Sequence, residues 1–434
     1  MKRILAFALA MAMLLTLAAC GGNSVDPTVD TPAADAPVEE KPDAAEARDL
    51  MDNITARDLE LNPDMEAGGI ALTQFGVELV KNSIANGENL LISPLSVICA
   101  LAMTANGARE ETLAQMEDVF GLSVEELNAY LRQYVASLPQ GENYSLRVAN
   151  SIWVNDHARF TPRQEFLQTN ADYFGADIYT LPFNSAALGA INSWVNDKTE
   201  GMIPTILDQI PPEALMYLVN ALAFEAKWRT EYNDYQVHER TFTKEDGTEQ
   251  TVELMYSMEN LYLENENATG FIKYYEDRSY AFVGLLPKGG VSIEELIASL
   301  SGEELYALLN DAQATMVNVA IPKFETEYSV ELTSVLETMG MVNAVDEDLA
   351  DFSGLGTSTE GNLFISRVLH KTFISVGEQG TKAGAATVVE ICDATSAGPT
   401  EMKEVHLDRP FVYLLIDCES GVPFFIGITA SVEQ

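Results

Sequence analysis

The chain has 434 residues, of which 47% are hydrophobic and 9% aromatic, and its formal net charge is −41. This apolar content is enough for one large domain or for two to three small ones. The negative charge argues against nucleic acid and against a heparin-like anionic effector, because binding such polyanions requires clustered Lys and Arg.

The first twenty residues have the form of a secretory signal. The basic pair Lys2-Arg3 precedes an apolar run, Ile4 to Thr16, that is shorter than the ~20 residues of a membrane-spanning helix. Leu17-Ala18-Ala19-Cys20 then resembles the lipobox of bacterial lipoproteins, in which the cysteine becomes the lipidated N-terminus. We expect a signal peptide over residues 1–19 and an extracellular protein held at the cell-surface membrane through acyl chains on Cys20. An ordinary cleaved signal and a short membrane anchor are the alternatives.

Residues 20–63 are rich in Pro, Ala, Asp and Glu and poor in aromatic residues, which predicts a disordered, solvated tether. No internal repeat and no second linker follow this segment. We therefore expect residues 64–434 to form one domain.

Helical patterns dominate the first part of this domain, beginning near Ala67. The further helical stretches are Pro94 to Asn106, Arg109 to Phe120, Val124 to Leu138 and Pro162 to Tyr173. The strand-like apolar runs are Ser145 to Val154, Leu215 to Trp228, Tyr280 to Leu286, Thr315 to Pro322, Leu363 to Val376, Val405 to Cys418 and Phe424 to Ala430. Strands separated by long irregular spans favour an α+β fold with mixed sheets.

No catalytic or metal-binding motif is present in the sequence. The four histidines lie far apart, and none belongs to an H-E-x-x-H motif. A nucleophile elbow and a phosphate-binding loop are also absent. We expect no metal, no cofactor and no enzymatic activity.

Three cysteines follow Cys20, namely Cys99, Cys392 and Cys418. Their odd number and wide spacing argue against a disulfide framework. The apolar surroundings of Cys99 and Cys418 indicate buried small hydrophobic residues. Cys392 lies in a long loop and is a candidate exposed thiol.

The segment Glu378 to Thr387 is a run of small residues after a glycine. In an extended strand, Thr381, Ala383, Ala385 and Thr387 would face the same side, and all are small enough to be buried beneath a sheet. The other small residues of the run are Gly380, Gly384 and Ala386. A flexible surface loop is the alternative.

Several motifs occur in an order that resembles the serpin family, over about residues 67–430. They are Asn89-Leu90-Leu91-Ile92-Ser93-Pro94-Leu95-Ser96, Ile191-Asn192-Ser193-Trp194-Val195, Thr199-Glu200-Gly201, Leu218-Val219-Asn220-Ala221, Trp228, Val319-Ala320-Ile321-Pro322-Lys323-Phe324, Leu336, Gly340-Met341, His370-Lys371, Arg409-Pro410-Phe411 and Gly427. The resemblance implies a fold of three β-sheets and eight or nine helices with an exposed reactive-centre loop.

The resemblance further implies a suicide inhibitor of a serine protease. The target attacks the loop and forms an acyl-enzyme, and the cleaved loop then inserts as a new strand into the large sheet, as serpins do in general. The hinge of this movement would be Glu378 to Thr387, and the native fold would be metastable. A non-inhibitory serpin acting as a surface binding protein is the alternative, and an unrelated surface lipoprotein is a third hypothesis.

Five further residues acquire roles through the resemblance. Ser93, Ser96, Asn220 and His370 resemble the polar cluster beneath the opening sheet, where hydrogen bonds must break and re-form. Trp228 matches the position at which the loop first enters the sheet. Plain core packing is the alternative for all five.

The spacing usual in the family places the cleaved bond at Ala394–Thr395 when counted from Glu378. Thr395–Ser396 is the second choice and Cys392–Asp393 the third. A small residue at the cleaved position suits an elastase-like or subtilisin-like protease with a shallow pocket, although the family also includes inhibitors of cysteine proteases. We expect the protein to be a monomer.

Two positions depart from the family pattern. Gln379 stands where an acidic residue is common, and Lys382 stands where Glu is common. Both should point away from the inserted face, so we expect inhibition to be retained.

Overall fold

The computed structural model describes residues 47–432 apart from 86, 157–159, 212–213, 215, 360–361, 366 and 382–401. The proposed signal peptide, Cys20, Cys392 and all candidate cleavage positions therefore lie outside the described residues. So do Ala383, Gly384, Ala385, Ala386 and Thr387 of the hinge.

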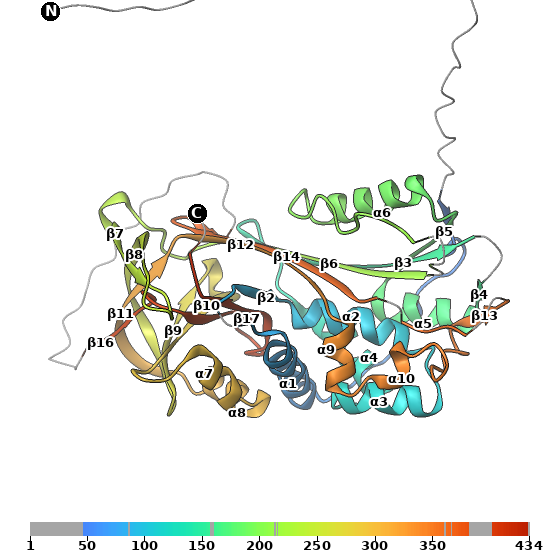
Figure 1. Ribbon diagram of the computed structural model, residues 1–434, viewed down its shortest axis with the longest axis horizontal. Coiled ribbons are helices and arrows are strands. Elements are labelled where there is room, and N and C mark those ends of the chain that lie inside the picture. The colour runs from blue at the N-terminus through green and yellow to red at the C-terminus, as the bar shows by residue number, and fades with distance from the viewer. Residues whose placement is uncertain are drawn as a thin grey trace, which may run out of the picture. The chain divides into compact units, whose positions relative to one another are not determined.

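Ten α-helices occur in this part of the chain (Figure 1). They are α1 (Met65–Ser83), α2 (Pro94–Ala105), α3 (Glu110–Phe120), α4 (Val124–Ser137), α5 (Gln164–Phe174), α6 (Ser185–Lys198), α7 (Ile293–Ser299), α8 (Gly302–Asn310), α9 (Thr333–Met339) and α10 (Val342–Val345). The expected number was eight or nine, and the difference lies in short helices such as α10, which has four residues. None of the helices in the described ranges is long and apolar enough to cross a membrane.

Local sequence signals explain where several helices begin and end. Ser93 caps α2 through its side chain and is followed by proline at the first helical position. Ser123 and Glu126 form a reciprocal capping box at the start of α4. Gly121 ends α3 with a φ of 73°, a left-handed conformation that costs glycine little.

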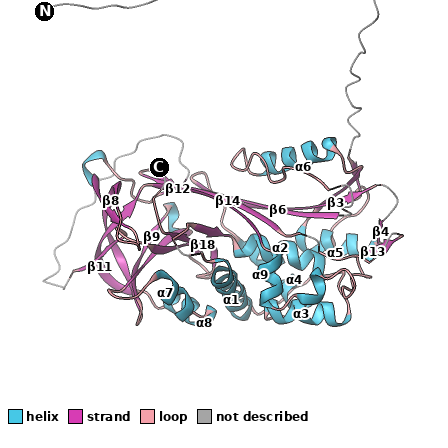
Figure 2. Ribbon diagram, in the orientation of Figure 1, coloured by secondary structure: helices cyan, strands magenta, loops and turns pink. Residues whose placement is uncertain are grey.

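A seven-stranded sheet forms one layer of the domain (Figure 2). Its strands, in spatial order, are β1 (Arg48–Asp49), β5 (Asp177–Leu181), β3 (Tyr144–Asn155), β6 (Met216–Lys227), β15 (Gly380–Thr381), β14 (Leu369–Gly377) and β12 (Phe324–Glu331). Helix α6 covers one face of this sheet, and α2, α4 and α5 lie on the other side (Figure 1).

A nine-stranded sheet makes the other large layer. Its path is β16 (Lys403–His406), β11 (Gln313–Pro322), β8 (Glu249–Glu264), β9 (Ala268–Tyr274), β10 (Tyr280–Pro287), β17 (Phe411–Asp417), β18 (Pro423–Thr429) and β2 (Leu90–Ile92), and β7 (Val237–Thr243) pairs with β8. A two-stranded sheet joins β13 (Gly356–Ser358) to β4 (Phe160–Pro162). The three expected sheets are present.

Residues 47–63 are ordered against the domain, although the composition predicts a solvated tether up to residue 63. Arg48 and Asp49 pair with the edge strand β5. The Arg57 backbone N–H and Nε donate to the Asp172 carboxylate, each at 2.7 Å, and the Asp172 side chain is fully buried. Residues before the predicted domain boundary at 64 therefore already pack against the domain.

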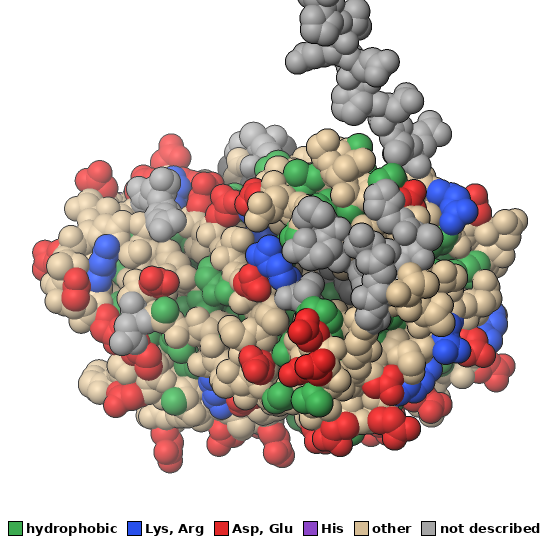
Figure 3. Space-filling model, turned by 45° about the vertical axis from the view of Figure 1, so that its right-hand side comes forward, with side chains coloured by type: hydrophobic (Ala, Val, Ile, Leu, Met, Phe, Trp, Pro, Cys, Tyr) green, Lys and Arg blue, Asp and Glu red, His purple; other side chains and the backbone are tan. Residues whose placement is uncertain are grey.

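Acidic side chains are spread over the surface, as the net charge requires. Figure 3 shows one face on which Asp and Glu outnumber Lys and Arg throughout. Such a distribution favours solubility and does not mark a particular site.

Candidate functional site

The seven-stranded sheet is interrupted between β6 and β14. Among the residues that the structure describes, these strands do not pair with each other, and only the two-residue strand β15 joins them. Gly380 and Thr381 pair with Lys227 and Ala226 of β6 on one side. On the other side they pair with Gly377 and Val376 of β14. The first two hinge residues after the turn thus already occupy the position of a central strand.

Gly380 is required at the start of β15. Its φ is +154°, and a Cβ at this position would lie 2.0 Å from the Ala226 carbonyl oxygen. Any side chain would collide with the backbone of β6. The glycine therefore allows the hinge to approach the neighbouring strand closely.

Thr381 points into the core, as the predicted alternation requires. Its side chain is 1% exposed, and its hydroxyl shares a hydrogen bond with the Tyr275 hydroxyl at 2.5 Å. Tyr275 stacks on Trp228 with ring centroids 4.4 Å apart. The first inward hinge position is therefore small, polar and fully satisfied.

Trp228 and Tyr232 bind the turn between β14 and β15 through its carbonyl groups. The backbone N–H of Trp228 donates to the Gln379 carbonyl, and that of Tyr232 donates to the Glu378 carbonyl, both at 2.9 Å. The Trp228 indole Nε1 donates to the Gly377 carbonyl at 2.8 Å. Three consecutive turn carbonyls thus have donors from one segment, which we call the docking segment (residues 228–232).

An ion pair fixes the outer side of the same turn. Lys323 lies 2.8 Å from the Glu378 carboxylate and 2.9 Å from that of Glu253. Burial raises the pKa of Glu378, but the hydrogen bond from Lys323 outweighs it, so the pKa lies below its usual value. Because all three side chains are partly exposed, this network contributes modestly to stability.

A second cluster lies beneath β14, at Ser93 and His370. The Ser93 backbone N–H donates to His370 Nε2 at 3.1 Å, and the Ser96 N–H donates to the Ser93 hydroxyl at 3.2 Å. Thr372, which was not predicted, donates from its hydroxyl to the Leu91 carbonyl at 2.8 Å. Burial lowers the pKa of His370 to about 4, so the imidazole is neutral at pH 7 and Nε2 can accept.

Four of the five residues predicted for the opening sheet therefore divide between two places, and the fifth lies elsewhere. Ser93, Ser96 and His370 form the cluster beneath β14, whereas Trp228 lies at the hinge. Asn220 lies in β6 opposite Asn150 of β3, and its side chain is outside the described residues. Tyr232, Tyr275 and Lys323, which contact the hinge turn or β15, were not predicted as site residues.

Cys99 and Cys418 are free cysteines, the first buried and the second partly buried. Burial raises the pKa of both thiols to about 12. They are therefore protonated at neutral pH and inert as nucleophiles.

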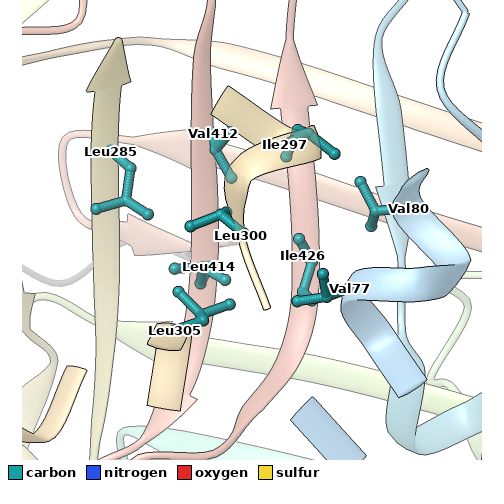
Figure 4. Close-up of a pocket in the computed structure, with 9 residues that line it drawn as sticks. All are labelled: Val77, Val80, Leu285, Ile297, Leu300, Leu305, Val412, Leu414 and Ile426. Carbon is teal, nitrogen blue, oxygen red and sulfur yellow. The ribbon is translucent and has the colours of Figure 1, made fainter. Parts of the chain in front are cut away.

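A small cavity lies between α1, the region of α7 and α8, and the strands β10, β17 and β18 (Figure 4). It holds about 10 Å³ and is lined by nine aliphatic side chains. A water molecule would find no polar partner there, and small-molecule sites usually offer several hundred cubic ångströms. The cavity has no room for an organic ligand in this conformation.

The sequence and the fold match known proteins over most of the chain. A model of the serpin (serine protease inhibitor) family matches residues 70–432. The thermophilic serpin tengpin in its native state is 48% identical, covers 89% of this chain and all of its own, and superposes with a TM-score of 0.84. For the latent state of tengpin the TM-score is 0.76.

Curated relatives give the same assignment. A serpin-like protein of Thermococcus kodakarensis is 32% identical over 82% of this chain and 84% of its own. The leukocyte elastase inhibitor of Xenopus laevis is 31% identical over 81% and 96%. The chain therefore belongs to the serpin family, whose members are generally inhibitors of proteases.

Proposed function

We propose that the protein traps a serine protease as an acyl-enzyme by inserting its cleaved loop between β6 and β14. The single observation that carries this proposal is β15, a two-residue strand that already lies in that position. Insertion needs no new site, because it extends an existing ladder from Thr381 onward.

The register of β15 defines where the following residues would go. Continued without a shift, positions 383 and 385 would face Phe224 and Leu222 of β6. Position 387 would lie between Asn220 of β6 and His370 of β14. The corresponding residues of β14, at 370, 372, 374 and 376, are all buried. Ala383, Ala385 and Thr387 would therefore meet the core, which favours their small size.

We place the cleaved bond at Ala394–Thr395, with Thr395–Ser396 as the second choice. A small residue at this position fits the shallow primary pocket of an elastase-like or subtilisin-like protease. The similarity to an elastase inhibitor of Xenopus laevis supports this class of target. The absence of a basic residue at or next to this bond agrees with it.

The alternative function is a non-inhibitory serpin that binds a ligand or partner at the cell surface. The apolar cavity of Figure 4 is too small for a small-molecule ligand, at about 10 Å³, but an open pocket lined by α1, the end of α3, Glu303 and Met339 holds about 640 Å³. The small inward hinge residues favour inhibition, since a non-inhibitory member has no need for an insertable loop.

The test is incubation with elastase and, separately, with subtilisin. We expect a complex that survives SDS, together with a released C-terminal peptide whose mass identifies the bond. Thr381→Arg is the matched variant, because a charge at this already buried position should displace β15 and block insertion, while the sequence of the loop beyond it is unchanged. Cleavage by both proteases without a complex would support the non-inhibitory alternative.

We also propose that acyl chains on Cys20 hold the protein at the cell-surface membrane. The support is the Leu17-Ala18-Ala19-Cys20 pattern at the end of an apolar run. Metabolic labelling with a palmitate analogue should label the wild type and not Cys20→Ser. Equal labelling of both proteins would contradict this anchor.

A further inference from the structure

Lys273 of β9 is a buried lysine directly beneath the docking segment. Its side chain is only 2% exposed. An ammonium group rarely becomes this buried unless it is paired, because removal from water is costly. Lys273 contacts the residues that bind the hinge turn, so its burial needs an explanation in terms of that turn.

The Lys273 ammonium contacts the docking segment on one side and Glu259 of β8 on the other. Its Nζ donates to the Glu259 carboxylate at 2.9 Å and to the Thr230 carbonyl at 3.4 Å. It also lies 4.5 Å from the ring centroid of Tyr232 and 5.2 Å from that of Trp228. A single cation thus contacts residues 228, 230 and 232 and ties them to β8 through Glu259.

Glu259 is the anion that balances this charge. Burial lowers the pKa of Lys273, but Tyr232 and Glu259 together raise it above its usual value. Burial raises the pKa of Tyr232, so its phenol is neutral at pH 7 and acts through its ring and hydroxyl. The Ser257 hydroxyl donates to Glu259 at 2.7 Å and lies 3.2 Å from the Tyr232 hydroxyl, which closes the network.

We infer that Lys273 is a positioning residue for loop insertion. It holds the docking segment so that the N–H groups of Trp228 and Tyr232 meet the carbonyls of Gln379 and Glu378. These bonds set the register in which β15 begins, and the loop must follow that register before the acyl-enzyme is hydrolysed. This role rests on the proposed inhibitory function, whereas the positioning itself is a property of the uncleaved protein.

The experiment compares three variants with the wild type and one control. Lys273→Met removes the charge and keeps the apolar stem. Lys273→Met combined with Glu259→Gln avoids leaving a buried carboxylate without its partner, in case the single variant folds poorly. Lys273→Arg restores the charge. The control is Lys288→Met, because Lys288 pairs with Glu264 at 2.9 Å at the far end of β8 and is not in contact with the hinge.

Two readouts separate positioning from general stability. Hydrogen exchange by mass spectrometry reports the amides of residues 228–232, and titration of subtilisin gives the moles of inhibitor consumed per mole of protease trapped. In the two variants with methionine at position 273 we expect exchange about tenfold faster in this segment and inhibitor consumption raised roughly fivefold or more. Lys273→Arg should restore much of both values, and Lys288→Met should resemble the wild type.

Each outcome bears on a different claim. Unchanged exchange at residues 228–232 in the double variant overturns the positioning role, whatever happens to inhibition. Faster exchange at residues 228–232 with unchanged consumption of inhibitor would mean that Lys273 holds the docking segment but does not matter for trapping. If the wild type itself forms no complex with subtilisin or elastase, the proposed function fails, and the exchange result still decides whether Lys273 holds the docking segment.

Discussion

The two large sheets differ in how completely their strands are joined. In the nine-stranded sheet, β10 pairs with β9 and β17 along most of its length, and every residue of β10, β17 and β18 is buried. In the seven-stranded sheet, the described parts of β6 and β14 are joined only through Gly380 and Thr381. In the described residues one sheet is paired along its whole path, whereas in the other β6 and β14 have no shared partner beyond β15.

This difference indicates which part of the molecule determines stability and which part determines function. Substitutions in the nine-stranded sheet should weaken the native and the loop-cleaved forms alike. Substitutions in β15, or in the parts of β6 and β14 beside it, should change mainly the rate at which the native form converts to the loop-inserted form. Under the proposed mechanism the native fold is held by a kinetic barrier, and this separation would let the barrier change without loss of the core.

The largest expected effect on stability comes from Leu414→Ala in β17. Leu414 is fully buried and lines the cavity in Figure 4. The variant should lose about 2–5 kcal/mol because it enlarges an apolar cavity. Denaturant unfolding of the native and the cleaved protein should show similar losses in both. A loss confined to one form would contradict the proposed separation.

Thr381→Arg should abolish trapping while the native core remains. Thr381 is already buried beside Tyr275 in the uncleaved protein, so an unpaired charge there should displace β15 from the sheet, and the loop is then cleaved as a substrate. The ratio of complex to cleaved inhibitor on SDS gels measures the change. Gln379→Arg is the control, because Gln379 lies in the turn and is partly exposed. Full trapping by Thr381→Arg would mean that the inserted strand does not begin here.

Gly380→Ala should expel the hinge from the sheet. Its Cβ would lie 2.0 Å from the Ala226 carbonyl oxygen, whereas a Cβ at Gly377 would meet nothing within 4 Å. We expect at least about a tenfold rise in inhibitor consumed per protease for Gly380→Ala and little change for Gly377→Ala. Equal behaviour of the two variants would contradict the close approach of β15 to β6.

Acidification should weaken the cluster beneath β14. The pKa of His370 is about 4 in the folded protein and near 6.5 when unfolded, so the unfolded state binds the proton first. Stability from this group is fully present above pH 6.5 and is lost as the pH falls towards 4, by roughly 3 kcal/mol. His370→Gln keeps an acceptor for the Ser93 N–H without titrating. Unfolding measured between pH 7 and 4 should therefore show a smaller slope for this variant.

Lys323→Met should have the smallest effect, about 0–1 kcal/mol, because its carboxylate partners are partly exposed. The pKa of Glu378 is lowered in the folded state, so this contribution is present at neutral pH and is lost as the pH falls through the folded pKa. Thermal unfolding at pH 7 and at pH 4 should show a smaller difference between variant and wild type at pH 4 than at pH 7. A large loss at both values would point to a packing role for Lys323.

Sequence patterns predict the hinge because its signal is local. Glycine followed by alternating small residues favours a strand that is buried closely against others, and Thr381 is buried in such a strand, whereas residues 383–387 lie outside the described residues. The helix α2 is likewise predicted by Pro94 after Ser93. The run Val405 to Cys418, in contrast, was expected as one strand, but β16 and β17 are separated at Arg409-Pro410, since proline cannot donate to a ladder.

The residues that bind the hinge could not be predicted in the same way. Tyr275 and Lys273 belong to a part of the chain where no strand was expected, because β8 and β9 mix polar and apolar residues. A buried lysine leaves no periodic signal, since its role depends on Glu259 and Tyr232, which only the fold brings to it. Leu50, Met51 and Ile54, apolar residues within the supposed tether, were the one available sign of its contact with the core.

The central claim is that the cleaved loop becomes a strand between β6 and β14. Thermal unfolding of the native protein and of the subtilisin-cleaved protein, followed by circular dichroism, tests it most directly. Insertion completes the seven-stranded sheet, so the cleaved protein should unfold at least about 10 °C higher than the native protein. Cleaved protein that unfolds at the same temperature as the native protein, or lower, would contradict insertion.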